Sequence, residues 1–290
     1  MRYEGKIYRP PSEANSYILQ ATIGCSWNKC VYCDMYRDKQ YRERDLTEVL
    51  TDVETAASVI GPDLGKVFVA DGDALGMSMA HWQPILGALE QQFPRLKRVS
   101  CYATAQNLLQ MSMTDLRTLR TAGLQRLYIG PESGDDVTLK RIAKGATFAD
   151  HVEAAQKAHE AGFELSVIAL LGVGGRDRSE VHARETGRLV TEMDPAFFAA
   201  LTTTIIPGTP LARMASREKF VLPSVHEMLG ELKEMLREAQ PTSALFRTNH
   251  ASNYLPLAGR IPQDSEALMG KIEAALEGRM GLRPEWLRNL

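Results

Sequence analysis

The chain has 290 residues, of which 44% are apolar and 24% are charged, a composition typical of a globular protein with one large domain or two smaller ones. Its 34 basic and 36 acidic residues nearly cancel, so charge gives no reason to expect a nucleic-acid or membrane partner, although it does not exclude an RNA substrate. No uninterrupted apolar run approaches the ~18 residues of a membrane-spanning helix, and we expect a cytoplasmic protein.

Short apolar segments alternate with amphipathic ones from Tyr17 onward, and no linker or internal repeat divides them. Several apolar segments are rich in Val, Ile, Leu or Phe, as buried parallel strands are. The predicted strands are Tyr17–Ile23, Lys66–Ala70, Arg98–Tyr102, Arg126–Gly130, Glu164–Leu170 and Phe197–Ile205.

Helical patterns fill the intervals between these strands, and capping residues, Gly or Asp-Pro mark their ends. Right-handed crossovers force the strands of six such βα units to be parallel. We therefore expect an α/β fold, a partial (β/α)6 TIM-like barrel, with ligands at the carboxyl ends of its strands. The predicted helices are Leu46–Ile60, Trp82–Phe93, Thr114–Ala122, Asp150–Ala161 and Glu180–Met193.

The remainder of the chain differs from this alternating pattern. Leu222–Gln240 and Ser265–Glu277 are predicted helices, and an irregular polar stretch, Arg247 to Tyr254, lies between them. We expect residues 1–215 to form the barrel core with an N-terminal lead-in, and residues 216–290 to form a helical extension packed on that core.

Three of the four cysteines lie in one loop directly after the first predicted strand. Cys25, Cys30 and Cys33 are separated by four and then two residues. Cysteines so few and so clustered do not suit a secreted disulfide scaffold and indicate metal or redox chemistry in a reducing compartment. Three thiolates can hold three irons of a cubane and leave the fourth iron open for a substrate.

Three other interpretations of these cysteines remain open. A zinc site would need a fourth ligand, and the nearest histidine is His81, without a Cys/His pair at finger spacing. A redox cluster with four thiolates would need Cys101, and the cysteines could also be buried structural thiols.

The cysteine loop resembles the cluster-binding loop of the radical SAM superfamily, whose usual spacing is three and then two residues. The resemblance implies a [4Fe–4S] cluster on Cys25, Cys30 and Cys33, with the amino and carboxylate groups of S-adenosylmethionine on the open iron. Tyr32 stands where the family carries an aromatic side chain near the adenine.

Later strand ends also resemble motifs of this superfamily. Asp71, Gly72 and Asp73 resemble its Gly-Gly-Glu motif, which implies acceptors for the ammonium group of S-adenosylmethionine. The turn that holds Glu132 and the following Lys144 resemble a stretch of oxygen-independent coproporphyrinogen oxidases and methylthiotransferases. That resemblance implies a ribose contact for Glu132 and a contact of Lys144 with the methionyl carboxylate.

The fifth and sixth strands end in stretches that contain Gly172 and Ile206, and both resemble elements that contact the adenine. One position differs from the coproporphyrinogen oxidases, because Ile168 stands where those enzymes carry an acidic residue that contacts the ribose. This difference argues against the porphyrin reaction.

The resemblance implies an enzyme with a nearly minimal core that cleaves S-adenosylmethionine reductively, and the 5′-deoxyadenosyl radical then abstracts hydrogen from a substrate. We expect a small-molecule substrate and an external electron donor such as flavodoxin or ferredoxin. Cys101 and Tyr102 are candidate hydrogen donors.

The alternative is a non-catalytic iron–sulfur protein for electron transfer or binding. The polar tail supplies the candidate substrate residues Arg247, Asn249, His250, Asn253 and Tyr254.

Overall fold

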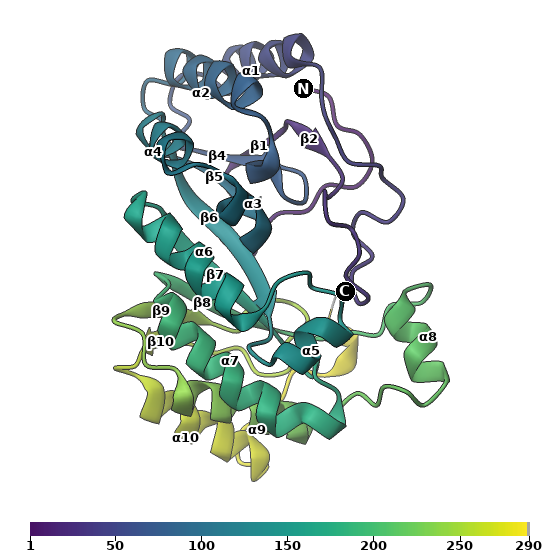
Figure 1. Cartoon of the computed structure of the whole chain (residues 1–290). Coiled ribbons are helices and arrows are strands. Elements are labelled where there is room, and N and C mark those ends of the chain that lie inside the picture. The colour runs from purple at the N-terminus through teal and green to yellow at the C-terminus, as the bar shows by residue number, and fades with distance from the viewer. Residues whose placement is uncertain (289–290) are drawn as a thin grey trace. The chain divides into compact units, whose positions relative to one another are not determined.

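The computed structural model describes residues 1–288 (Figure 1). Eight strands follow the order β1-β4-β5-β6-β7-β8-β9-β10 in a mostly parallel sheet with helices, which confirms the predicted α/β class and is consistent with a partial TIM-like barrel. The chain forms two compact units. Unit 1 comprises Met1–Asn28, Met35–Ile129 and Gln156–Leu165, and unit 2 comprises Lys29–Asp34, Gly130–Ala155 and the chain from Ser166 onward.

The sheet of unit 1 is parallel, and its apolar residues are buried. Tyr17 pairs with Val67 and Val67 pairs with Val99, so the first three strands run in register. Val67, Phe68 and Val69 are inaccessible to solvent, as the apolar run predicts. The strands are β1 (Tyr17–Gln20), β4 (Lys66–Ala70), β5 (Arg98–Ala103) and β6 (Leu124–Glu132), whose last residues belong to unit 2.

The predicted strand Tyr17–Ile23 is interrupted in the structure. The N–H group of Ala21 still donates to Ala70 O, but Thr22 then pairs with Glu43 on a different strand. A separate two-stranded antiparallel ribbon results, formed by β2 (Thr22–Ile23) and β3 (Arg42–Glu43), and it directs the chain into the cysteine loop.

Helices α1 and α2 pack side by side over the strands of unit 1 (Figure 1). Asp45 caps α1 by accepting a hydrogen bond from the N–H of Glu48 at 3.1 Å, and the side chain of Trp82 on α2 is wholly buried. The helices that begin in this unit are α1 (Leu46–Ile60), α2 (Met79–Gln92), α3 (Ala105–Gln110) and α4 (Met113–Thr121), and the short turns are η1 (Pro11–Glu13) and η2 (Ala74–Gly76).

Unit 2 continues the alternation of strands and helices. Its strands are β7 (Glu164–Leu171), which begins in unit 1, β8 (Phe197–Thr202), β9 (Ala244–Arg247) and β10 (Ala258–Ile261). Its helices are α5 (Asp136–Arg141), α6 (Phe148–Glu160, shared with unit 1), α7 (Ser179–Met193), α8 (Pro210–Ser216), α9 (Val225–Glu238) and α10 (Ser265–Leu276).

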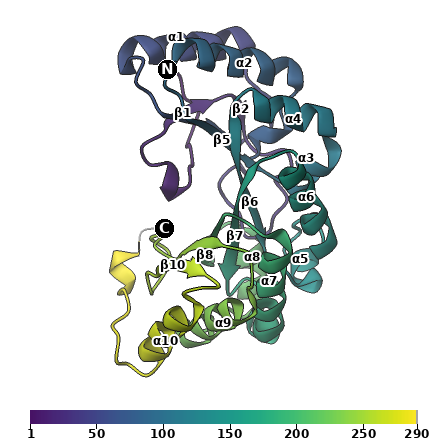
Figure 2. The same cartoon turned by 90° about the vertical axis from the view of Figure 1, so that its left-hand side faces the viewer.

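Helix α9 packs against both α7 and α10 (Figure 2). Gly187 permits the close approach of α7 to α9, because a Cβ atom at this position would lie 2.7 Å from Met235 O. The turns η3 (Arg176–Arg178) and η4 (Glu285–Leu287) complete the elements of this unit.

The tail contains two strands where the sequence predicted none. β9 pairs parallel to β8, and β10 pairs antiparallel to β9, so Arg247 ends a strand and does not begin an irregular stretch. The sixth predicted strand also ends earlier, at Thr202. Four-residue strands carry too little hydrophobic periodicity to be distinguished from a loop.

The expected division at residue 215 stays a prediction. No helix within residues 1–288 is long and apolar enough to cross a membrane.

Candidate functional site

The cysteine loop contributes residues to both units. Cys25 belongs to unit 1, and Cys30 and Cys33 belong to unit 2. All three are half-buried. The structure describes all four cysteines of the chain, and none of them forms a disulfide. Among residues 1–288, no three or more His, Cys, Asp or Glu side chains are already arranged as a metal site. Cluster ligation by these thiols stays a prediction.

In unit 1 the loop packs against the turn that follows β4. The carbonyl of Gly24 accepts a hydrogen bond from the N–H of Gly72 at 3.0 Å. A Cβ atom at Gly72 would lie 2.8 Å from Cys25 Cβ and 2.8 Å from the Tyr36 ring, so only glycine lets the turn approach the loop this closely.

The two acidic residues of this turn contact the loop. Asp73 accepts hydrogen bonds from the N–H of Ser26 at 2.8 Å and from its hydroxyl, and burial raises the pKa of Asp73. Asp71 is fully buried, and its Oδ2 accepts from the N–H of Gly24 at 3.1 Å. Its Oδ1 is a buried acceptor without a hydrogen-bond partner among the residues described. The predicted role of Asp71, Gly72 and Asp73 in cofactor binding stays a prediction.

In unit 2, three predicted cofactor residues lie in one cluster. Glu132 ends β6 with φ +69°, and its Oε1 accepts from the hydroxyl of Tyr32 at 2.9 Å and from Lys144 Nζ at 3.2 Å. The side chains of Lys144 and Glu132 are only 15% and 10% exposed. The sequence therefore identified an acid, a cation and a phenol that the fold brings together.

Two of the cysteines lie near this group and contribute to the pKa values of Lys144 and Tyr32. Burial alone would lower the pKa of Lys144, but the Glu132 carboxylate, assisted by the nearby Cys30 and Cys33, outweighs it and raises this pKa to about 12. Burial, the Glu132 carboxylate and the same cysteines raise the pKa of the Tyr32 phenol well above its usual value. The arrangement keeps Lys144 cationic and Tyr32 neutral at ordinary pH.

The backbone holds the second half of the cysteine loop in unit 2. The N–H of Val31 donates to Ile142 O at 3.0 Å, and the carbonyl of Val31 accepts from the N–H of Leu211 at 3.0 Å. The loop thus docks on the end of α5 and the start of α8, which orients Tyr32 toward Glu132.

The candidate adenine elements have different environments. Gly172 follows β7 with φ +81°, and its N–H donates to Glu231 Oε2 at 2.6 Å. Glu231 also accepts from Ser179 Oγ at 2.5 Å, and burial raises the pKa of Glu231 to about 7. Sequence reasoning missed this carboxylate, because only its place in an amphipathic helix is visible there. Ile206 is 36% exposed between β8 and α8.

The candidate substrate residues of the tail are divided by burial. Arg247 and Asn249 are exposed, whereas Asn253 is 2% exposed. The Asn253 amide donates to Ala200 O at 2.7 Å and to Thr248 O at 3.0 Å. Through these bonds Asn253 connects β8 to the residue that follows β9.

His250 and Tyr254 are half-buried, and residues near the end of the described chain contact this loop, since Arg283 Nη1 donates to His250 O at 3.1 Å. The Tyr254 hydroxyl donates to Glu285 at 3.0 Å, and the Arg288 guanidinium lies 3.8 Å from the centre of the Tyr254 ring. The cavity lined by Asn253 and Tyr254 has a volume of about 10 Å³, room for a single water molecule. Substrate binding by the tail residues stays a prediction.

The candidate hydrogen donors on β5 face opposite sides of the sheet, because side chains alternate along a strand. Cys101 is fully buried beside Asp73, and burial raises the pKa of its thiol. Tyr102 is half-buried and packs edge-to-face on Phe68, with ring centres 5.1 Å apart. Their catalytic roles stay predictions, and the alternation means that both cannot face one substrate directly.

Residues 19–186 match the family model described as the Radical SAM superfamily. This match covers more than half of the chain and includes the cysteine loop and the strand-end residues up to Gly172, whereas Ile206 lies outside it. The chain therefore belongs to the radical SAM superfamily.

Among curated proteins, the chain is 22% identical over 213 residues to the heme chaperone HemW of Bacillus subtilis (strain 168), a match that covers 71% of the chain and 55% of the relative. The chain thus spans about half the length of this relative.

Solved structures with similar folds include radical SAM proteins of several activities. Coproporphyrinogen III oxidase (HemN) from Escherichia coli has a TM-score of 0.59 at 16% identity, over 77% of this chain and 51% of that one. The methyltransferase TsrM from Kitasatospora setae has a TM-score of 0.55 at 19% identity, over 69% of this chain and 39% of that one. Methylornithine synthase (PylB) has a TM-score of 0.53 at 17% identity, over 78% and 63%. At these identities the likeness concerns the fold alone.

Proposed function

We propose that the chain is a radical SAM enzyme that binds a [4Fe–4S] cluster through Cys25, Cys30 and Cys33. When bound, the cluster would pass one electron to S-adenosylmethionine, whose reductive cleavage would give methionine and a 5′-deoxyadenosyl radical that abstracts hydrogen from a small-molecule substrate. The observation that carries the proposal is the largely buried group of Tyr32, Glu132 and Lys144, in which Tyr32 stands next to Cys33 in the cysteine loop.

The residues of unit 2 suit the cofactor by their chemistry. The Lys144 ammonium would pair with the methionyl carboxylate, and the Glu132 carboxylate would accept hydrogen bonds from ribose hydroxyl groups. Tyr32 holds the end of the cysteine loop near both groups. Because these side chains are largely buried, they would also exclude water from a reactive intermediate.

In unit 1 the buried Oδ1 atom of Asp71 fits a group that brings a hydrogen-bond donor. This oxygen has no partner within the described residues, and a buried acceptor left unpaired is costly. The ammonium group of S-adenosylmethionine would supply such a donor. An external donor such as flavodoxin or ferredoxin would supply the electron, and we propose a cytoplasmic location.

A non-catalytic role is the second candidate, and the observation that favours it is the match to a heme chaperone over 71% of the chain. In that case the chain would bind a cluster but would not turn over S-adenosylmethionine.

Anaerobic reconstitution with iron and sulfide, followed by dithionite and S-adenosylmethionine, separates these candidates. We expect about four irons per chain and formation of 5′-deoxyadenosine. Cys30→Ala should lose both, whereas the matched variant Cys101→Ala should keep its iron. Loss of iron in Cys101→Ala would instead indicate a cluster with four protein thiolates. A wild-type cluster without 5′-deoxyadenosine would favour the non-catalytic role, and stoichiometric zinc would contradict both.

A further inference from the structure

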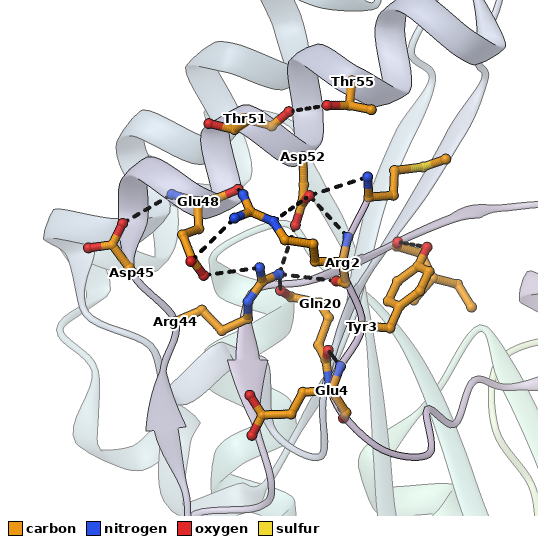
Figure 3. A network of polar contacts seen from close by, with 12 residues as sticks. Arg2, Tyr3, Glu4, Gln20, Arg44, Asp45, Glu48, Thr51, Asp52 and Thr55 are labelled. Carbon is orange, nitrogen blue, oxygen red and sulfur yellow. Dashed lines mark hydrogen bonds and ion pairs between the residues drawn. The ribbon is translucent and has the colours of Figure 1, made fainter.

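A continuous set of polar contacts joins the first residues of the chain to the cysteine loop, entirely within unit 1. We call residues 1–8 the N-terminal segment. Arg2 faces α1, where its backbone N–H and its Nε donate to Asp52 Oδ1 at 3.1 and 3.4 Å (Figure 3). The buried Arg44 donates to the other carboxylate oxygen of Asp52 at 2.9 Å. These bonds fix the beginning of the N-terminal segment on the helix.

Gln20, the last residue of β1, forms the next link. Its Oε1 accepts from the N–H of Glu4 at 2.7 Å, and its Nε2 donates to Glu4 O at 3.1 Å (Figure 3). The same Nε2 donates to Asp71 Oδ2 at 3.1 Å. One buried amide therefore ties the N-terminal segment to the turn after β4.

Asp71 and Lys39 close the chain of contacts. Lys39 Nζ lies 2.9 Å from Asp71 Oδ2 and donates to Lys6 O at 2.6 Å. The side chains of Lys39 and Asp71 are 7% and 0% exposed, so this is a buried ion pair. Asp71 Oδ2 also accepts from the N–H of Gly24, one residue before the first cysteine.

The three cysteines of the loop lie between Gly24 and Lys39 in the sequence, and Asp71 contacts both of these residues. Fixing the two ends of a segment removes much of the conformational freedom that it would otherwise lose on binding a ligand. A buried ion pair suits this task, because removing one partner leaves the other charge without compensation.

We infer that Lys39 and Asp71 are positioning residues for the cysteine loop, and that the N-terminal segment, through Gln20 and Lys6, is part of the same anchor. The ordering of the loop stands on the contacts alone. Its consequence for the iron–sulfur cluster rests on the proposed function.

Hydrogen–deuterium exchange of the iron-free full chain tests the anchor without a cluster. In Lys39→Met we expect amides of residues 2–8 and 24–28 to exchange about tenfold faster, while amides of α9 are unchanged. Lys97→Met, an exposed lysine of the same unit, is the matched control and should behave as the wild type. Unchanged exchange of residues 24–28 in folded Lys39→Met would overturn the inference.

If Lys39→Met does not fold, the double variant Lys39→Met/Asp71→Asn removes both charges and leaves no buried ion unpaired. Faster exchange at residues 2–8 and 24–28 in this variant supports the anchor, and exchange equal to that of the wild type contradicts it.

Iron release from the reconstituted chain to a chelator tests the consequence for the cluster. We expect release about tenfold faster in Lys39→Met, or in the double variant, than in Lys97→Met. Faster exchange with unchanged iron release would confine the effect of Lys39 to the order of the loop and overturn its consequence for the cluster. A wild-type chain that takes up no iron would refute the proposed function, and exchange would still decide the anchor.

Discussion

The two groups of predicted cofactor residues differ in what their charges contact. In unit 1 the carboxylates of Asp71 and Asp73 accept hydrogen bonds from the cysteine loop. In unit 2 the carboxylate of Glu132 contacts Lys144, another candidate ligand residue that lies outside the loop, as well as Tyr32 of the cysteine loop. Acidic residues in similar positions at strand ends therefore contact different groups, which the sequence motif alone does not show.

The two groups of residues should therefore respond differently to substitution. Substitutions around Asp71 should change loop order and stability first, because they remove bonds that hold the chain. Substitutions around Glu132 should change cofactor binding and turnover first, since the cluster connects few elements of the fold.

The largest stability change is expected for Lys39→Met. It leaves the Asp71 carboxylate buried without its cation, and breaking a buried pair in this way costs about 3–5 kcal/mol. Denaturant unfolding of the iron-free protein would measure the loss. The double variant Lys39→Met/Asp71→Asn should recover part of it, because no buried charge then remains unpaired. A loss below about 1 kcal/mol for the single variant would mean that the pair is accessible to water.

Glu132→Gln should show the opposite behaviour. We expect a smaller loss of stability than in Lys39→Met, because this ion pair is more exposed than that of Lys39. We also expect a decrease of about 100-fold in 5′-deoxyadenosine formation, since the acceptor charge paired with Lys144 is lost. Glu180→Gln, an exposed carboxylate on α7, is the matched control and should keep the wild-type rate. A large loss of stability with normal turnover would instead give Glu132 a structural role.

Features of the fold and the site could be predicted from the sequence where they depend on residues close together in the chain, and not where they depend on residues far apart in it. The structure reproduces Leu46–Ile60 and Lys66–Ala70 as predicted, because a cap, a periodic pattern and an apolar run are local signals. The cysteine spacing is equally local. The partners of Asp71 are not, since Gln20 lies 51 residues and Lys39 32 residues away in sequence. β9 and β10 were missed for the same reason, as their pairing is decided by the fold.

Glu231 offers a pH-dependent test within unit 2. The pKa of this carboxyl is about 7 in the folded chain, above its usual value, because burial disfavours the charge. The folded state therefore binds a proton that the unfolded state has released, so stability is lost as pH rises from about 4.5 to 7. A difference of this size corresponds to about 3 kcal/mol.

To test this, the free energy of unfolding would be measured for the wild type and for Glu231→Gln between pH 5 and pH 8. The wild type should lose stability relative to the variant over this interval, and the variant should lack this contribution. His182, 3.9 Å from Glu231, has a pKa lowered by burial to about 4 and stays neutral in this range. If the free energies of unfolding of the wild type and the variant changed with pH in the same way, water would reach the Glu231 carboxylate in the folded chain.

The smallest effect is expected for Asp45→Ala, which separates the stability of unit 1 from the order of its loop. Asp45 caps α1, and losing such a cap typically costs about 1 kcal/mol. The cap shares no bond with Lys39 or Asp71 among the contacts described, so amides of residues 24–28 should exchange as in the wild type under native conditions. If Asp45→Ala accelerated their exchange as much as Lys39→Met does, general destabilisation of unit 1 would explain both results, and the distinction between an anchored loop and a ligand cluster would lose its main support.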